Sequence, residues 1–169
     1  MTITIKPIAI EDIAGFRQAL DRVAHERRYL LLLEAPAPEQ VEAFVRANIE
    51  RKVAQFVAVD KGQVIGWCDI RPHTWSGVTH TGVLGMGLLA EYRGQGLGYR
   101  LLEATVNQAL ANGLTRIELE VFASNRAAIA LYEKFGFERE GLKRKARYVD
   151  GSWDDFVMMA LVRQGDRPS

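Results

Sequence analysis

Three glycines at alternating positions could bind a phosphate group. Gly94, Gly96 and Gly98 stand just before a helical pattern, and Arg93 precedes them. Glycine loses much conformational entropy when it is ordered and forms helices poorly, so its placement here needs a reason. The first turn of a helix has backbone N–H groups without partners, and the helix dipole favours an anion there. Because glycines lack Cβ atoms, a phosphate can approach these groups, and the arginine adds a positive charge.

The residues before and after the turn support a phosphate site and exclude two other nucleotide motifs. An apolar run with β character, VLGMGLLA at residues 83–90, leads into the turn, and a helix follows it. The P-loop pattern GxxxxGK[ST] is absent. The run GMGLLA at residues 85–90 matches the dinucleotide pattern G-x-G-x-x-G/A. It lies inside the expected strand rather than at a strand-to-helix turn, so we reject that match.

Two segments of the chain together resemble the GNAT superfamily of N-acetyltransferases. The run RGQGLG at residues 93–98 resembles the family signature (R/Q)-x-x-G-x-(G/A). The run LEVFASNRAAIALYEKFGFEREG at residues 119–141 resembles the family's strand–helix–strand segment, and locally that of the ribosomal-protein alanine N-acetyltransferases. The two motifs occur in the family's order. The resemblance covers residues 83–141 well and is looser elsewhere.

The resemblance implies acetyl-CoA as the co-substrate and indicates the residues that bind it. The turn that would bind the pyrophosphate consists of Arg93, Gly94, Gln95, Gly96, Leu97 and Gly98. Met86, Gly87 and Leu88 would line the pantetheine arm, and a backbone N–H near Leu88 would polarise the thioester carbonyl. Asn125 matches the family's asparagine near the cofactor, but a simple helix cap explains it equally well.

Direct acyl transfer requires a neutral amine, a stabilised carbonyl oxygen and a proton for the leaving thiolate. Tyr132 matches the family tyrosine that donates this proton, and a phenol is a neutral donor at physiological pH. The alternative is core packing, since Ile129 and Tyr132 share one face of a helix.

The general base is expected among a few carboxylates. The resemblance to the ribosomal-protein alanine enzymes implies Glu120, five residues before Asn125. Glu118 points to the same face of the expected strand, because strand side chains alternate, and either residue could be a solvated edge carboxylate. Glu34 and His80 are reserve candidates. The sequence predicts no metal site, because HERRY at His25 begins like H-E-x-x-H but lacks the second histidine.

The elements that position these residues alternate between strand and helix. We expect a strand at residues 2–10, a helix capped by Asp12, a helix from Pro38, and a hairpin over residues 55–70. A strand at residues 83–89, a helix ending at residues 112–113, a strand at residues 116–122 and a helix capped by Asn125 or Ser124 follow. The last strands are residues 137–141 and 156–162, with residues 143–153 as their connection and a turn at Asp150–Gly151.

This order predicts a mixed α/β sheet with helices against it, in one domain over residues 1–164 with a frayed tail at 165–169. The resemblance implies a mostly antiparallel sheet whose central strands splay. The 169 residues carry 22 Lys+Arg and 21 Asp+Glu, so no nucleic-acid or membrane partner is expected. A single cysteine and the lack of a signal-peptide pattern favour the cytoplasm. The oligomeric state is open, with a homodimer among the alternatives.

The sequence therefore predicts an N-acetyltransferase that moves the acetyl group of acetyl-CoA to a primary amine. We expect an α-amine, from a free amino acid or a protein N-terminus, with another small-molecule amine as the alternative. A rival of a different class is a non-catalytic acyl-CoA-binding or regulatory module, because fold does not fix function. A nucleic-acid-binding module rests only on the basic cluster at residues 143–147, which a solvated hairpin explains better.

Overall fold

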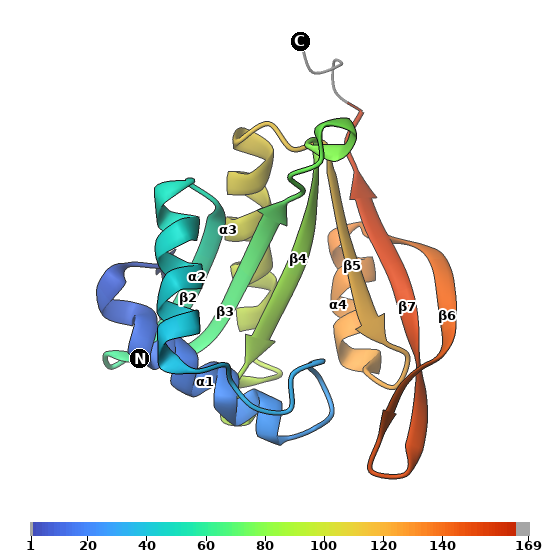
Figure 1. Ribbon diagram of the computed structural model, residues 1–169, viewed down its shortest axis with the longest axis horizontal. Coiled ribbons are helices and arrows are strands. Elements are labelled where there is room, and N and C mark those ends of the chain that lie inside the picture. Colours follow the sequence, from blue (N-terminus) through green and yellow to red (C-terminus); the bar gives the residue numbers. More distant parts are fainter. Residues whose placement is uncertain (1, 165–169) are drawn as a thin grey trace.

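The computed structural model describes residues 2–164, so the tail expected at residues 165–169 lies outside the described residues. One seven-stranded sheet has the strand order β1-β2-β3-β4-β5-β7-β6 (Figure 1). All neighbouring strands are antiparallel except β4 and β5, which confirms the mixed, mostly antiparallel sheet. The elements are β1 (Thr4–Pro7), α1 (Ile13–His25), α2 (Pro38–Glu50), β2 (Ala54–Asp60), β3 (Gln63–Pro72), β4 (Thr81–Leu88), α3 (Leu97–Ala111), β5 (Arg116–Phe122), α4 (Arg126–Phe135), β6 (Glu138–Val149) and β7 (Ser152–Val162).

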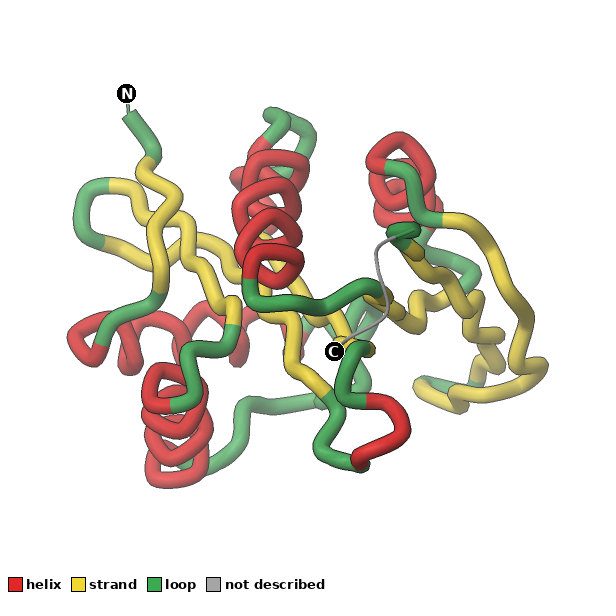
Figure 2. The backbone as a smooth tube through the Cα atoms, turned by 90° about the horizontal axis from the view of Figure 1, so that it is seen from above, coloured by secondary structure: helices red, strands yellow, loops and turns green. Residues whose placement is uncertain are grey.

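The helices cover the two faces of the sheet in pairs. Helices α1 and α2 lie on one face, which we call the α1/α2 face, and α3 and α4 lie on the other, the α3/α4 face (Figures 1 and 2). Helix α1 buries Phe16 and Val23, and helix α3 buries Leu102 and Val106. Because apolar residues recur every three to four positions, each helix turns one stripe toward the sheet.

Several local expectations are confirmed by the structure. The order of strands and helices is the expected one, and α2 begins at Pro38. The hairpin between β2 and β3 turns at Lys61 and Gly62, both at positive φ. Asn125, rather than Ser124, caps α4 by accepting a hydrogen bond from the Ala128 N–H at 3.2 Å.

Two expectations differ from the structure. Asp12 stands before α1 but does not cap it, because its carboxylate accepts hydrogen bonds from the Ala9 N–H at 2.9 Å and from Lys6 Nζ at 2.7 Å. The expected connection at residues 143–153 is wrong, since β6 and β7 continue through it to the turn at 150–151. Tyr148 and Trp153 stack across these strands with ring centroids 4.6 Å apart, a cross-strand contact that stabilises the long hairpin.

The central strands β4 and β5 separate soon after they begin to pair. They are parallel neighbours only at Thr81, Gly82 and Val83, although β4 continues to Leu88. On its other side β4 remains paired with β3 from Gly82 to Leu88. Figure 1 shows the two strands diverging toward the end of β4. The splayed strands implied by the sequence resemblance are thus present.

Gly87 allows Trp67 to pack against the surface of β4. The two residues are cross-strand partners, and a Cβ built on Gly87 would lie 2.3 Å from the indole ring. Trp67 is buried and makes an edge contact with Phe16 of α1, with centroids 5.7 Å apart. Glycine at position 87 therefore brings the indole onto the strand beside the point where the sheet opens.

We expect Gly87→Ala to destabilise the fold, because the new methyl group overlaps a buried indole that cannot move freely. Overpacking of this kind costs about 1–3 kcal/mol, measurable as a lower urea midpoint. Gly85→Ala is the matched control, on the same face of the same strand, where the nearest atom to a Cβ is 3.8 Å away. Equal unfolding midpoints for the two variants would contradict this account of Trp67 packing.

Candidate active site

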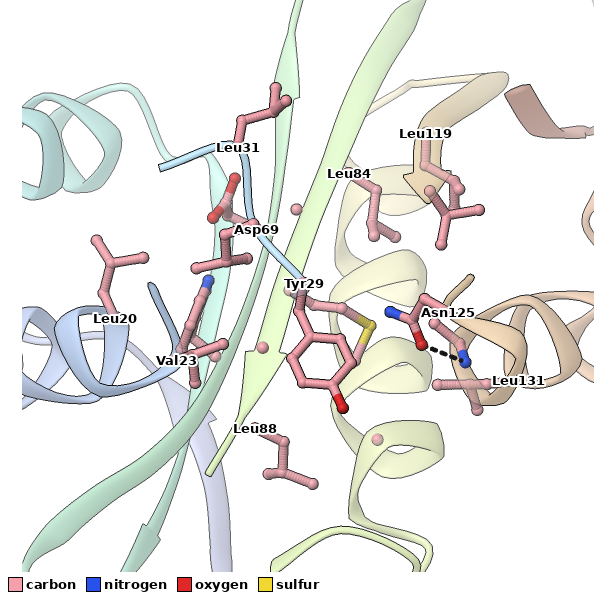
Figure 3. Close-up of a pocket in the computed structure, with 18 of the residues that line it drawn as sticks. Leu20, Val23, Tyr29, Leu31, Asp69, Leu84, Leu88, Leu119, Asn125 and Leu131 are labelled. Carbon is pink, nitrogen blue, oxygen red and sulfur yellow. Dashed lines mark hydrogen bonds between the residues drawn. The ribbon is translucent and has the colours of Figure 1, made fainter. Parts of the chain in front are cut away.

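A cavity of about 970 Å³ passes through the sheet where β4 and β5 diverge. Its lining comes from both faces. From the α1/α2 face come Leu20, Val23, Val41, Phe44, Trp67 and Asp69. From the α3/α4 face come Gly98, Asn125, Leu131 and Tyr132. Figure 3 shows Asp69 on one side of β4, and Asn125 and Leu131 on the other. Two molecules entering from opposite faces could therefore meet inside the gap.

The glycine turn lies at the cavity wall and opens the first turn of α3. Gly94 and Gly96 have φ values of 74° and 79°, which glycine adopts most readily, and a Cβ on either would meet no atom within 4 Å. Gly96 is the N-cap of α3, and no side chain caps the helix. The N–H groups of the first turn are thus available to an anion, as the sequence predicts.

Arg93 is held by contacts within the protein. Its Nε donates to the Leu88 carbonyl oxygen at 2.9 Å, and its two terminal nitrogens donate to the carboxylate of Glu26 at 2.9 and 2.7 Å. The guanidinium also lies 4.5 Å from the centroid of the Tyr29 ring. These contacts fasten the end of β4 to the segment after α1, and a phosphate-binding role for Arg93 stays a prediction.

The backbone of β4 presents N–H groups to the gap. Leu89 N–H donates to the Ile65 carbonyl oxygen, on the β3 side, at 2.9 Å. Because hydrogen-bonding groups alternate sides along a strand, the N–H groups of Met86 and Leu88 point the opposite way. On that side β5 has already diverged. These two N–H groups could therefore donate to a carbonyl oxygen placed between the strands.

Tyr132 and Asn125 reach the cavity from α4. Tyr132 is 6% exposed, and burial raises the pKa of its phenol, with a smaller contribution from the nearby Cys68 thiol. The phenol therefore keeps its proton at neutral pH and is a proton donor. Asn125 caps α4 through its Oδ1 atom, which leaves its amide nitrogen for another partner in the cavity. Both alternatives considered for Asn125 are thus compatible with its position.

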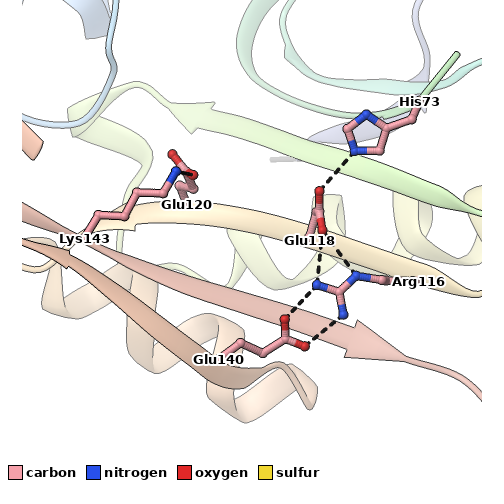
Figure 4. A network of polar contacts seen from close by, with 6 residues as sticks. All are labelled: His73, Arg116, Glu118, Glu120, Glu140 and Lys143. Atoms are coloured by element: carbon pink, nitrogen blue, oxygen red, sulfur yellow. Dashed lines mark hydrogen bonds and ion pairs between the residues drawn. The ribbon is translucent and has the colours of Figure 1, made fainter. Parts of the chain in front are cut away.

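The two carboxylates of β5 have different partners (Figure 4). Glu118 accepts a hydrogen bond from His73 at 3.0 Å and from Arg116 at 3.1 Å, and these contacts lower the pKa of its carboxyl group. Glu118 does not line the cavity. Glu120 lines the cavity, is paired with Lys143 and has a side chain that is 39% exposed. Of the pair, Glu120 is the one placed to contact a substrate.

Sequence reasoning missed Asp69, a carboxylate on the cavity wall. Asp69 is 5% exposed, and burial raises its pKa to about 6, against the opposing effect of Arg71. The signal was present in the sequence, because Asp69 interrupts the apolar run VIGWCDI of an expected buried strand. The reserve candidates Glu34 and His80 do not line the cavity.

The described residues give no support for a metal site or a membrane span. Within residues 2–164, no three His, Cys, Asp or Glu side chains gather in a way that could hold a metal ion. Over the same range, no helix is long and apolar enough to cross a membrane.

Comparison with known proteins identifies the family. The sequence model of the acetyltransferase (GNAT) family matches residues 20–137. The chain belongs to the GNAT family. A putative [ribosomal protein bS18]-alanine N-acetyltransferase of Bacillus subtilis is 30% identical over 76% of this chain and 82% of its own. The L-amino acid N-acetyltransferase AaaT of Escherichia coli is 28% identical over 95% of this chain and 98% of its own.

A solved structure supports the fold. A GNAT superfamily phosphinothricin acetyltransferase from Sinorhizobium meliloti, in complex with acetyl-CoA, superposes with a TM-score of 0.92, covering 100% of this chain and 94% of that one at 21% identity. The protein is therefore an acetyl-CoA-dependent N-acetyltransferase with the GNAT fold, and it transfers acetyl groups to amines.

We expect Gly96→Leu to weaken acetyl-CoA binding at least tenfold, because the new side chain would project over the N–H groups of the glycine turn. Gly113→Leu is the matched control at the other end of α3, where φ is also positive, at 100°, and the space is also open. Both variants should lose about 1–2 kcal/mol of stability from the left-handed conformation. Calorimetric titration measures the acetyl-CoA affinity separately from the loss of stability. If the two variants bind acetyl-CoA equally well, the glycine turn is not part of the cofactor site.

Proposed function

We propose that this GNAT enzyme acetylates an α-amine, of a free amino acid or of a protein N-terminus. The observation that carries the proposal is the kind of acceptor in the names of its two relatives. One is named as a putative [ribosomal protein bS18]-alanine N-acetyltransferase and the other as an L-amino acid N-acetyltransferase. An alanine residue and a free L-amino acid share an α-amine as the group that can be acetylated. The matches to the two relatives cover 76% and 95% of this chain.

The cost of deprotonation favours the same class of acceptor. A lysine-like amine has a pKa near ~10.4 and an α-amine near ~8, so at neutral pH about a tenth of the α-amine is already uncharged. The difference amounts to about 3 kcal/mol, at roughly 1.36 kcal/mol per pKa unit. A half-exposed carboxylate that is paired with a lysine, as Glu120 is, suits the less demanding proton transfer.

The chain's own residues supply each remaining part of the reaction. Glu120 accepts the proton of the attacking amine, and the N–H groups of Met86 and Leu88 stabilise the negative charge on the carbonyl oxygen. As the C–N bond forms and the C–S bond breaks, the Tyr132 hydroxyl gives its proton to the leaving sulfur. Asn125 and the glycine turn at residues 93–98 orient the cofactor. The acetyl thioester supplies the activated acyl group.

Two alternatives are weaker on specific grounds. A non-catalytic acyl-CoA-binding module would not need a proton donor and a carboxylate on the two sides of one gap, where Tyr132 and Glu120 lie. Acetylation of a polyamine is not indicated by the names of the two sequence relatives. One domain over residues 1–164, a cytoplasmic location and a homodimer stay predictions from the sequence.

The acceptor class is tested by a panel of amines with free CoA as the readout. We expect α-amines of amino acids and of short peptides to give the highest kcat/KM, by at least tenfold over polyamines and over lysine side chains with blocked α-amines. Peptides with a blocked N-terminus and no lysine are the control. A preference for polyamines would overturn the α-amine proposal, and no turnover of any amine would favour a binding module.

The role of Tyr132 is tested by Tyr132→Phe, which keeps the ring and removes the proton donor. General acid catalysis contributes about 10²–10⁴-fold, so kcat should fall within that range while the affinity for acetyl-CoA stays the same. Tyr99→Phe is the control, because that ring lines the same cavity from α3 and has no assigned proton transfer. If the chemical step is rate-limiting and kcat is unchanged, Tyr132 is not the proton donor and its role is core packing.

A further inference from the structure

Asp69 faces a part of β4 that carries no side chains. Asp69 and Gly85 are cross-strand partners in β3 and β4, and the next partners on the same face are Trp67 and Gly87. A Cβ built on Gly85 would lie 3.8 and 3.9 Å from the two oxygens of the Asp69 carboxylate. The carboxylate is therefore next to bare backbone, two residues beyond the last β4–β5 pair at Val83. The Asp69 carboxylate therefore lies on the α1/α2 side of the gap between β4 and β5.

The Asp69 carboxylate is only partly satisfied within the protein. Its Oδ1 atom accepts a hydrogen bond from Arg71 Nε at 3.1 Å. Within residues 2–164 its Oδ2 atom accepts no hydrogen bond and is not fully enclosed, and the side chain as a whole is 8% exposed. A buried charge that is incompletely paired costs free energy, so such groups occur mainly where function requires them. The free oxygen lies on the wall of the cavity.

Among the described residues that line the cavity, Asp69 is the buried carboxylate and Glu120 is the exposed one. β2 places the neutral Gln55 opposite Asp69, and β4 places Gly85 there. The residues of α1 and α2 that line the cavity are uncharged: Phe16, Leu20, Val23, Gln40, Val41 and Phe44. Arg71, on its own strand, is the one charged group that shifts its pKa.

The other carboxylates near the gap are neutralised or more exposed. Glu118 on β5 is paired with both His73 and Arg116, and Glu120 with Lys143. Beyond β4, Glu26 is paired with both terminal nitrogens of Arg93. An ammonium group that enters from the α1/α2 face therefore meets one buried carboxylate with a free oxygen.

We propose that Asp69 binds the ammonium group of the acceptor through its Oδ2 atom and holds it against β4, on the side of the gap opposite Tyr132. The inference rests on the proposed function and assigns the acceptor subsite of the same reaction. It divides the work between two carboxylates. Asp69 positions the ammonium group before reaction, and Glu120 then takes one of its protons, which leaves the neutral amine to attack the carbonyl carbon. Apolar residues that line the same cavity from α1 and α2, such as Leu20 and Phe44, then favour an acceptor with an apolar side chain.

The charge on Asp69 predicts how acceptor binding depends on pH. With a pKa of about 6, the carboxylate is ionised at neutral pH and becomes protonated below that value. The KM for the amine should therefore rise as the pH falls through 6. In an Asp69→Asn variant this increase should be absent.

The Asp69 carboxylate also predicts how the free energy of unfolding depends on pH. A carboxylate whose role was only to stabilise the fold would have a lowered pKa and the opposite pH dependence. The folded pKa is raised above the unfolded value of about 3.9, so between these values the folded state binds more protons than the unfolded state. The free energy of unfolding should then decrease as the pH rises through that window. Because Asp69→Asn removes a buried charge and keeps its shape, the variant should be at least as stable as wild type at pH 7.

The test compares Asp69→Asn with Glu120→Gln and with the control Asp60→Asn. Asp60 is a buried aspartate on β2 that accepts a hydrogen bond from Tyr92 at 2.8 Å and does not line the cavity. We expect Asp69→Asn to raise the KM of the best amine about ten- to hundredfold, the size of a charge-assisted hydrogen bond, with kcat and the acetyl-CoA KM within threefold of wild type. Glu120→Gln should lower kcat, and Asp60→Asn should leave both amine parameters unchanged.

Three results would overturn the role of Asp69: an unchanged amine KM in folded Asp69→Asn, a loss confined to kcat, or a variant that is less stable than wild type at pH 7. Calorimetric binding of the amine to the complex with CoA gives a readout without turnover. If the panel shows a polyamine to be the best acceptor, the α-amine proposal fails, yet the Asp69 test still applies, because every such amine carries an ammonium group.

Discussion

The early separation of β4 from β5 is the constraint on which the rest of the site depends. Pairing ends at Val83, and the edge of β4 that continues beyond it has no strand beside it. An unpaired strand edge inside a fold is costly unless another group satisfies its N–H and C=O groups. The opening turns the sheet from a barrier into a passage, and the cavity joins the two helical faces through it. An acyl donor and an amine can thus approach one carbonyl from opposite sides.

The two faces of the passage differ in charge. On the α3/α4 side, the first turn of α3 and the Tyr132 phenol offer hydrogen-bond donors. On the α1/α2 side, Asp69 and Glu120 offer acceptors. Donors suit a phosphorylated acyl donor and its leaving sulfur, and carboxylates suit an ammonium group. The distribution of charge therefore agrees with acetyl transfer from acetyl-CoA to an amine, which is the activity of this GNAT enzyme.

Parts of the fold and of the candidate site could be predicted because their signals are local in the sequence. The glycine turn, the cap at Asn125 and the hairpin turn at Lys61–Gly62 each depend on a few consecutive residues. The family resemblance added Tyr132 and Glu120 through two short motifs. The failures were of a different kind. Residues 143–153 were expected to connect the last two strands, because the contact between Tyr148 and Trp153 that extends these strands forms only when they pair.

The sequence by itself determined the order of elements, the glycine turn before α3 and the family. The tertiary structure alone decided which charges are free to act. Glu26 lies 67 residues from Arg93 in the chain and His73 lies 45 from Glu118, so no local pattern reveals that these pairs neutralise each other. The pKa of Asp69 also depends on distant segments. They exclude water from its carboxylate, and this burial raises the pKa. Spacing along a chain fixes local geometry, whereas solvation and pairing of a charge depend on everything that surrounds it in space.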